Sequence, residues 1–188
     1  MPAPTDNFRK PTILVLEYGV LTDAELTVLG LVVERPRHGY ELDEVVSERG
    51  MREWTALGFS SIYYVLGKLR DRGLVAEVAE ERAHAKAKKT FTATEAGRKA
   101  CAAAAEAAIA ELRPVHPPVL VGLANSPAVP PERLAAALAR RTEAVEERLA
   151  EVRRAAAAQE HAPPFVRAIF DYSVAQLEAE ARWLEGMT

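Results

Sequence analysis

The side chains best suited to chemistry in this chain lie in one short segment, residues 59–75. Its apolar residues recur at spacings of three and four, which predicts a helix with one buried face. These residues are Ile62, Val65, Leu66 and Leu69. The opposite face carries Ser60, Tyr64 and Lys68, beside the small Gly67. Hydroxyl and ammonium groups on a thin helix can reach phosphates and base edges in a DNA major groove. The segment therefore predicts a nucleic-acid interface.

The expected helix has a start and an end in the sequence. Ser60 is a typical N-cap residue, and Gly73 suits the left-handed conformation that often follows a helix end. Groups at a helix N-terminus also bind phosphate, so Ser60 and Ser61 are candidate contacts, with simple capping as the alternative for Ser60. Tyr64 lies on the exposed face as a candidate groove contact. Tyr63 also belongs to the candidate set, although its position in the pattern favours packing.

A local excess of basic residues follows this helix, although the whole chain carries a net charge of −3. Six basic residues between positions 82 and 99 stand against one acid, Glu95: Arg82, Lys86, Lys88, Lys89, Arg98 and Lys99. The flanking patterns predict strands at 74–78 and 89–92 with a long charged loop between them. A DNA footprint needs only a local basic face. Lys86, Lys88 and Lys89 are therefore candidate phosphate contacts, the alternative being a solvated charge run.

Residues that carry enzymatic chemistry are scattered. The 4 histidines lie far apart, without metal-ligand spacing, and the chain has no Gly-rich phosphate loop and no nucleophile elbow. The lone Cys101 lies in an alanine-rich stretch, where a small buried side chain is expected. We therefore expect no enzyme, no catalytic residues, no cofactor and no metal.

Length and composition indicate a soluble protein. The chain has 188 residues, of which 49% are hydrophobic and 27% charged, enough for one good core or two small domains. No apolar run approaches the roughly 20 residues of a membrane span, and the first residues lack a signal-peptide pattern. A single cysteine cannot form an internal disulfide. A cytoplasmic location without membrane contact is the expectation.

The order of the elements before residue 114 predicts a winged helix-turn-helix. Thr22 and Glu25 form a capping box at the start of a first helix that Pro36 ends. A second helix is expected from about residue 39 to 49, followed by the helix described above and the two-stranded hairpin. Thr94 caps a fourth, alanine-rich helix that is expected to run to about residue 113.

The remainder of the chain predicts two long helices. Apolar residues recur every seven positions over 131–159, and a second apolar stripe follows over 165–185, after a break at Pro163 and Pro164. Two such helices bury little alone, so we expect a homodimer. The expected dimerisation residues are Leu138, Val145, Leu149, Val152, Leu177 and Leu184.

The predicted fold class is mostly α, with a winged helix-turn-helix N-terminal domain and a helical C-terminal dimerisation domain. The expected boundaries are an N-terminal extension over 1–20, the DNA-binding domain with its connecting helix over 21–113, a Pro-rich linker over 114–130 and the dimerisation domain over 131–188.

Several of these motifs, in this order, resemble the PadR family of bacterial transcriptional regulators. The resemblance is carried by His38-Gly39-Tyr40-Glu41, by Ser61-Ile62-Tyr63 with Leu66, Leu69 and Gly73, and by Phe91-Thr92-Ala93-Thr94-Glu95-Ala96-Gly97. The tail 177–187 is similar to the helical C-terminal domain of longer members. The resemblance implies a dimeric repressor on a near-palindromic, double-stranded operator, relieved by a small molecule or another signal. It also adds Tyr40 to the candidate DNA contacts.

Two alternatives stay open. A winged helix can serve as a protein–protein docking module without DNA, and the acidic pI of about 5.9 and Gly67 favour this slightly. Separately, the short side chains of Ala104 and Ala108 could leave an apolar cavity for a small aromatic effector across a dimer axis. The competing explanation, which we favour, is that these alanines let two helices pack closely.

Overall fold

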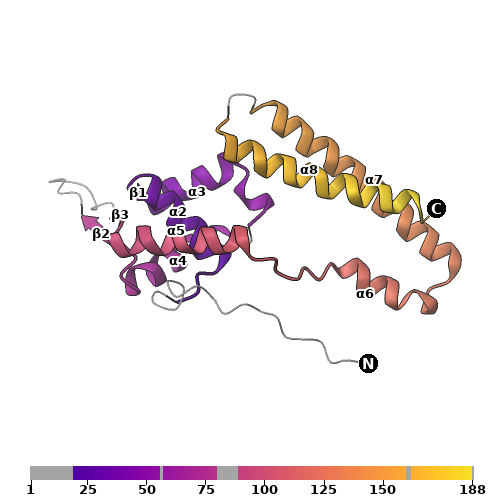
Figure 1. Cartoon of the computed structure of the whole chain (residues 1–188), viewed down its shortest axis with the longest axis horizontal. Helices are drawn as coiled ribbons and strands as arrows, with labels where there is room; N and C mark the ends of the chain where they lie inside the picture. The colour runs from indigo at the N-terminus through magenta and orange to yellow at the C-terminus, as the bar shows by residue number, and fades with distance from the viewer. Residues whose placement is uncertain (1–18, 56, 80–88, 160–161, 188) are drawn as a thin grey trace. The chain divides into compact units, whose positions relative to one another are not determined.

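The computed structural model describes residues 19–55, 57–79, 89–159 and 162–187. The chain divides into two compact units, a first unit of residues 1–113 and a second unit of residues 114–188. The described part is mostly helical, with one small antiparallel sheet (Figure 1), as the sequence predicts.

The first unit holds the sheet and the short helices. Its elements are α2 (Asp23–Glu34), β1 (Arg37–His38), α3 (Gly39–Glu48), the 3-10 turn η1 (Met51–Glu53), α4 (Phe59–Asp71), β2 (Val75–Ala79), β3 (Lys89–Ala93) and α5 (Glu95–Ala110). The second unit contains α6 (Pro118–Ala124), the 3-10 turn η2 (Ser126–Ala128), α7 (Pro131–Ala157) and α8 (Pro164–Glu185).

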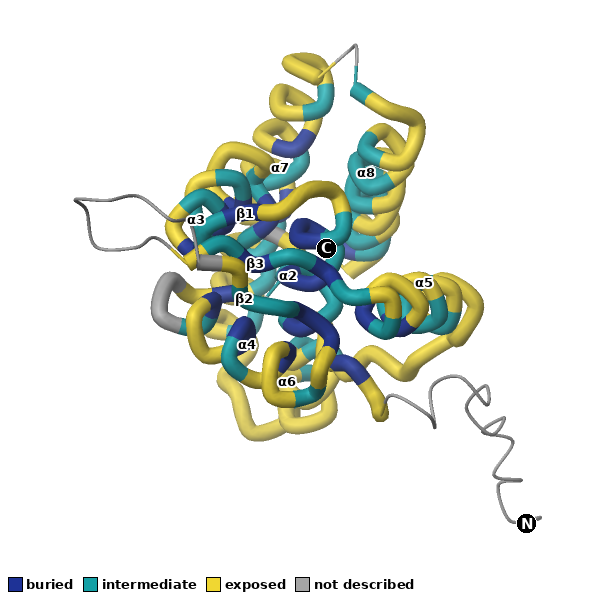
Figure 2. Tube along the Cα trace, turned by 90° about the vertical axis from the view of Figure 1, so that its left-hand side faces the viewer, coloured by how far each residue is buried: buried dark blue, intermediate teal, exposed yellow. Residues whose placement is uncertain are grey.

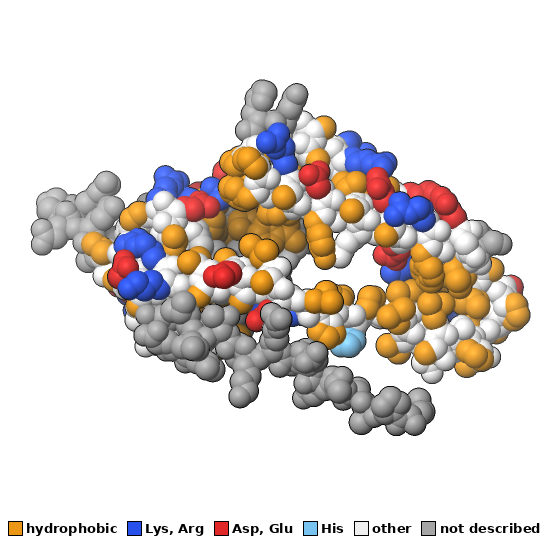
Figure 3. Space-filling view, viewed as in Figure 1, with side chains coloured by type: hydrophobic (Ala, Val, Ile, Leu, Met, Phe, Trp, Pro, Cys, Tyr) orange, Lys and Arg blue, Asp and Glu red, His pale blue; other side chains and the backbone are white. Residues whose placement is uncertain are grey.

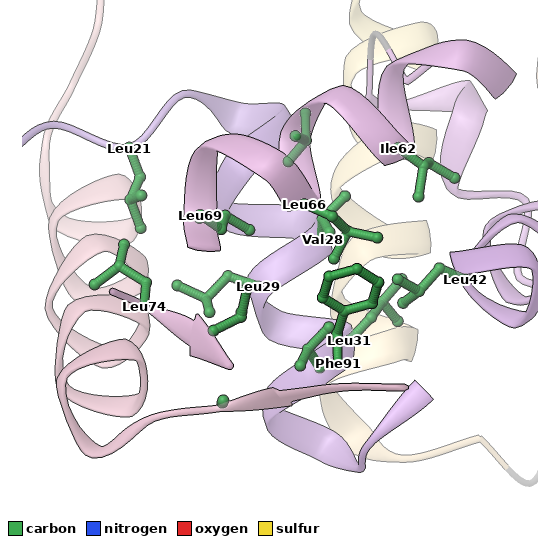
Figure 4. Close-up of a cluster of buried hydrophobic side chains, with 14 of the residues drawn as sticks. Leu21, Val28, Leu29, Leu31, Leu42, Ile62, Leu66, Leu69, Leu74 and Phe91 are labelled. Carbon is green, nitrogen blue, oxygen red and sulfur yellow. The ribbon is translucent and has the colours of Figure 1, made fainter. Parts of the chain in front are cut away.

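The core of the first unit lies between α2, α4 and the strands. Leu29 of α2 and Leu66 and Leu69 of α4 are fully buried, and Phe91 of β3 points toward the same cluster (Figure 4). Burying each such leucine contributes about 1.5–3 kcal/mol. Figure 2 shows the same result along the chain, with buried residues on α2, α4 and the strands. The apolar face predicted for α4 is confirmed, because all four of its residues are buried.

The start of α2 confirms the predicted capping box. The Thr22 hydroxyl accepts a hydrogen bond from the Glu25 backbone N–H at 3.2 Å. The Glu25 carboxylate in turn accepts one from the Thr22 backbone N–H at 2.9 Å. Two N–H groups that a helix start leaves without partners are thereby satisfied.

The sheet has three strands in the order β1-β3-β2, with antiparallel pairing throughout. The two predicted hairpin strands are confirmed, since Val75 pairs with Ala93 and Ala79 with Lys89. Strand β1 was not predicted from the sequence. Its two residues lie opposite Phe91 and Thr90. Two residues are too few for the alternation by which a strand is read from sequence.

A tight turn joins β3 to α5. The Thr94 hydroxyl accepts a hydrogen bond from the Gly97 N–H at 2.9 Å and donates to the Gly73 carbonyl at 2.8 Å. A Cβ on Gly97 would lie 1.9 Å from the Leu74 carbonyl oxygen. Only glycine therefore fits at this contact between α5 and the chain entering β2.

Two predicted helix ends were wrong, the start of α4 and the end of α5. Helix α4 begins at Phe59 with Gly58 as its N-cap, so Ser60 lies inside the first turn. The extended backbone of Gly58 starts the helix there, and its carbonyl accepts from the Ser61 N–H at 3.0 Å. Helix α5 ends at Ala110 because Glu111 turns to an extended conformation. The predicted Pro-rich linker contains helix α6, whose first residue, Pro118, suits a helix start.

The second unit is built on the α7–α8 pair, which lies side by side in Figure 1. Val145 and Val152 of α7 and Leu184 of α8 are buried. Arg153 of α7 pairs with Glu178 of α8 at 2.7 Å, and Arg141 pairs with Glu180. Apolar and ionic contacts thus hold the two helices together.

Candidate nucleic-acid interface

The exposed face of α4 carries two adjacent aromatic side chains. Tyr64 is 66% exposed and Tyr63 is 53% exposed. The sequence favoured packing for Tyr63, and the structure supports that in part. A Cβ on Gly39 would lie 2.5 Å from Cε1 of the Tyr63 ring, so Gly39 lets the ring lie against the start of α3. Tyr63 therefore packs with one part and presents the rest to solvent.

Lys68 lies one turn after Tyr64 on the same face. Its Nζ atom is 5.0 Å from the centroid of the Tyr64 ring, within the range of a cation–π contact. A contact of this kind limits the freedom of both side chains on the exposed face of α4. The Tyr64–Lys68 pair is therefore a partly ordered feature of this surface.

The two serines of α4 differ in what the structure shows. Ser60 lies in the first helical turn, but its side chain is outside the described residues. Ser61 is half-buried, and its backbone N–H already donates to the Gly58 carbonyl. That N–H is therefore engaged within the chain.

Tyr40 occupies the second position of α3 and is half-exposed. The turn before it is fixed by the Glu41 carboxylate, which accepts from the His38 backbone N–H at 2.7 Å. The His38 ring nitrogen Nδ1 lies 3.1 Å from the Thr90 hydroxyl of β3. Since the Tyr63 ring lies against Gly39, the start of α3 brings two tyrosines from different helices to one region.

The wing is described only at its base. Lys86 and Lys88 lie outside the described residues, whereas Lys89 opens β3 with an exposed side chain. The Lys89 ammonium pairs with Glu77 of β2 at 2.9 Å, and Arg70 of α4 lies 3.6 Å from the same carboxylate. Hydrogen bonding from Lys89, with a smaller contribution from Arg70, lowers the pKa of Glu77. Glu77 thus connects the wing to α4.

Glu25 is a second acidic residue beside α4. The sequence indicated it only as part of the capping box of the first helix. The Glu25 carboxylate lies 3.3 Å from Nη1 of Arg72 and 4.0 Å from Nζ of Lys68. Arg72 also donates to the Gly19 carbonyl at 3.2 Å. An open hollow at this place is lined by Gly19, Val20, Thr22, Glu25, Lys68, Asp71 and Arg72. A local sequence pattern cannot indicate this contact, because Glu25 is more than 40 residues away from Lys68 and Arg72 in the sequence.

Ala104 and Ala108 border a small hollow between α5 and the start of α2. Its volume is about 30 Å³, which is enough for about one water molecule. Ala104 packs against the core of the first unit. In the single chain, this hollow is too small for an aromatic ring.

The six expected dimerisation residues fall into two groups. Val145, Val152 and Leu184 are buried within the single chain, and Leu138, Leu149 and Leu177 are half-buried. Other apolar side chains of the second unit are exposed, which the seven-residue spacing did not indicate: Leu120, Val121, Phe165 and Tyr172. Figure 3 shows hydrophobic side chains gathered around α6.

Within the described part of the chain, no group of three or more His, Cys, Asp or Glu residues is placed to hold a metal ion. None of its helices is both long enough and apolar enough to cross a membrane. Cys101 is half-buried, and burial raises the pKa of its thiol, which makes it less reactive.

A helix pair followed by α4 and a β-hairpin defines a winged helix-turn-helix protein. Residues 28–103 match the family model described as the transcriptional regulator PadR-like family. This match lies within the first unit and covers less than half of the chain, so the similarity to PadR-like transcriptional regulators is carried by the first unit. No curated protein matches its sequence.

Several solved structures of PadR and PadR-like regulators have a similar fold. Bacillus subtilis PadR in complex with operator DNA is 16% identical, with a TM-score of 0.69 over 87% of this chain and 94% of that one. The same protein in complex with p-coumaric acid is 16% identical, with a TM-score of 0.70 over 87% and 95%. The PadR-like regulator BC1756 from Bacillus cereus is 19% identical, with a TM-score of 0.64 over 88% and 95%.

Proposed function

We propose that this protein is a PadR-like transcriptional regulator, a dimeric repressor that reads a near-palindromic operator with α4. The observation that carries the proposal is the exposed face of α4, where Tyr64 supports Lys68 and Tyr63 lies beside them. Aromatic and ammonium groups on one helix face can contact both bases and phosphates. Bacillus subtilis PadR, a structural relative, has been solved with its operator DNA.

The geometry of B-DNA sets a requirement on the dimer. Two copies of α4 that enter successive major grooves on one side of a duplex lie about 34 Å apart. A two-fold symmetric protein then reads two inverted half-sites. Tyr40 from the start of α3 and Lys89 from the wing would contact the flanking backbone, together with Lys86 and Lys88.

The test is selection from a random duplex library, followed by affinity measurements at several salt concentrations. We expect enrichment of an inverted repeat with half-sites centred about 10 base pairs apart. Affinity should fall steeply with salt, because phosphate neutralisation releases counterions. If the library yields no enriched sequence and the protein shows no salt-dependent binding, the proposal is refuted and a docking module is supported.

The docking module is a second candidate because basic side chains around α4 are paired with acids. Lys68 and Arg72 face Glu25, and Arg70 and Lys89 face Glu77. Each pairing reduces the positive charge offered to DNA.

An aromatic effector is part of the proposed function. Bacillus subtilis PadR has been solved with p-coumaric acid. Ala104 and Ala108 would line a site completed by a second copy, since the hollow in one subunit is too small. An effector must bind the DNA-incompetent state better than the competent one in order to release the operator. A panel of planar aromatic acids scored for operator release tests this, with Ala108→Trp as the variant expected to block it.

A further inference from the structure

A nearly buried carboxylate of α2 faces two basic side chains at the C-terminal end of α4. Glu25 is only 5% exposed, and its Oε2 atom accepts a hydrogen bond from the Thr22 N–H at 2.9 Å. This hydrogen bond and the burial prevent the carboxylate from turning away. It therefore stays beside Lys68 and Arg72, at 4.0 and 3.3 Å.

We propose that Glu25 is a specificity-determining residue, whose negative charge limits the affinity of α4 for DNA of arbitrary sequence. The inference rests on the proposed DNA-binding function. Affinity for arbitrary sequences comes almost entirely from phosphate neutralisation by Lys and Arg. A fixed carboxylate within reach of both cations neutralises them and repels phosphate. In the proposed operator complex, base contacts hold the face of α4 in a position where Lys68 gains no additional phosphate. The charge of Glu25 then lowers random-sequence affinity more than operator affinity, so the ratio of the two rises.

The position of Lys68 makes it the main target of this effect. Its ammonium has the Tyr64 ring at 5.0 Å and the Glu25 carboxylate at 4.0 Å. With the charge of Glu25 removed, the Tyr64 contact keeps Lys68 on the exposed face of α4, where phosphate can reach it. Arg72 keeps its hydrogen bond to the Gly19 carbonyl and is less free to move.

The capping box supplies a variant that removes the charge and keeps the cap. Glu25→Gln retains a side-chain oxygen for the Thr22 N–H, and glutamine is a normal residue at this capping-box position. The matched control is Asp23→Asn, which removes one negative charge from the same first turn of α2. Asp23 lies 4.0 Å from Arg113, and its side chain is mostly exposed. Its effect on α4 should be weaker, because its charge is further away and screened by salt.

The experiment measures binding of the full chain to a random-sequence duplex and to the selected operator across a salt series. One additional phosphate contact predicts a roughly five- to tenfold rise in random-sequence affinity near 0.1 M salt, with a slope steeper by about one. The operator affinity should rise less, and Asp23→Asn should change both affinities by less than half as much on a logarithmic scale. Adding Lys68→Ala to Glu25→Gln should remove most of the gain.

The outcomes separate the two proposals. If the parent protein binds no duplex even in low salt, the proposed function is refuted. If the parent binds its operator but Glu25→Gln behaves like Asp23→Asn, only the role of Glu25 is refuted. A Glu25→Gln variant that weakens random-sequence binding also overturns it, as does a gain that persists fully with Lys68→Ala. Thermal unfolding of each variant checks that the capping box is intact.

Discussion

At the scale of single residues, the proposed function gives Tyr64 two separable roles. Its hydroxyl can bond to a base or phosphate, and its ring supports the Lys68 ammonium. Tyr64→Ala removes both, whereas Tyr64→Phe keeps the ring. We expect Tyr64→Ala to reduce discrimination between operator and random duplex roughly tenfold, within the 1–3 kcal/mol typical of a base contact. Anisotropy titrations with both duplexes measure this ratio.

The Tyr64→Phe variant separates the contribution of the hydroxyl from that of the ring. If the hydroxyl reads the operator, Tyr64→Phe loses discrimination while its salt slope stays that of the parent. Neither variant should change the free energy of unfolding by more than about 0.5 kcal/mol, because the Tyr64 side chain is mostly exposed. Unchanged discrimination in Tyr64→Ala would place sequence reading on other residues.

At the scale of elements, the contact between α5 and the entry to β2 depends on Gly97. A Cβ there would lie 1.9 Å from the Leu74 carbonyl oxygen, which is backbone and cannot rotate aside. Gly97→Ala should therefore destabilise the first unit by about 1–3 kcal/mol or more. Chemical denaturation followed by circular dichroism measures the loss. Gly30→Ala, on α2 with open space around its Cα, is the control expected to be neutral or slightly stabilising.

A second element-scale prediction concerns the Glu34 carboxylate at the end of α2. Hydrogen bonding from Arg49, with a further contribution from Arg37, lowers the pKa of Glu34. A carboxyl whose pKa is lower in the folded state contributes stability above its unfolded pKa of about 4.3, and that contribution is lost as pH falls through the folded pKa. Glu34→Gln should flatten the fall in stability below pH 4.3, measured by urea unfolding. An identical pH profile in the variant would contradict this.

The elements that could be predicted from sequence are those with local signals. The apolar spacing of α4, the capping box at Thr22 and the short runs that form β2 and β3 all depend on neighbours within a few residues. Strand β1 is too short to produce a pattern, and Gly58 replaced the expected serine as N-cap of α4. The contacts of Glu25 with Arg72 and of Tyr63 with Gly39 join distant residues, and only the folded chain shows them.

At the scale of the whole molecule, the proposed function requires two copies on the operator, and we propose that the second unit supplies the surface for pairing. Leu149 lies on the same stripe of α7 as the buried Val145 and Val152 but remains half-buried in the single chain. Leu149→Glu should therefore oppose association more than folding, while Val145→Glu should unfold the α7–α8 pair.

We expect the parent to be a dimer at micromolar concentration by mass photometry or sedimentation. We expect Leu149→Glu to be a folded monomer with operator affinity reduced at least a hundredfold, because each half-site alone binds weakly. A folded parent monomer at that concentration, or a Leu149→Glu dimer with full operator affinity, would exclude this stripe as the dimer contact and direct attention to the exposed apolar residues of α6.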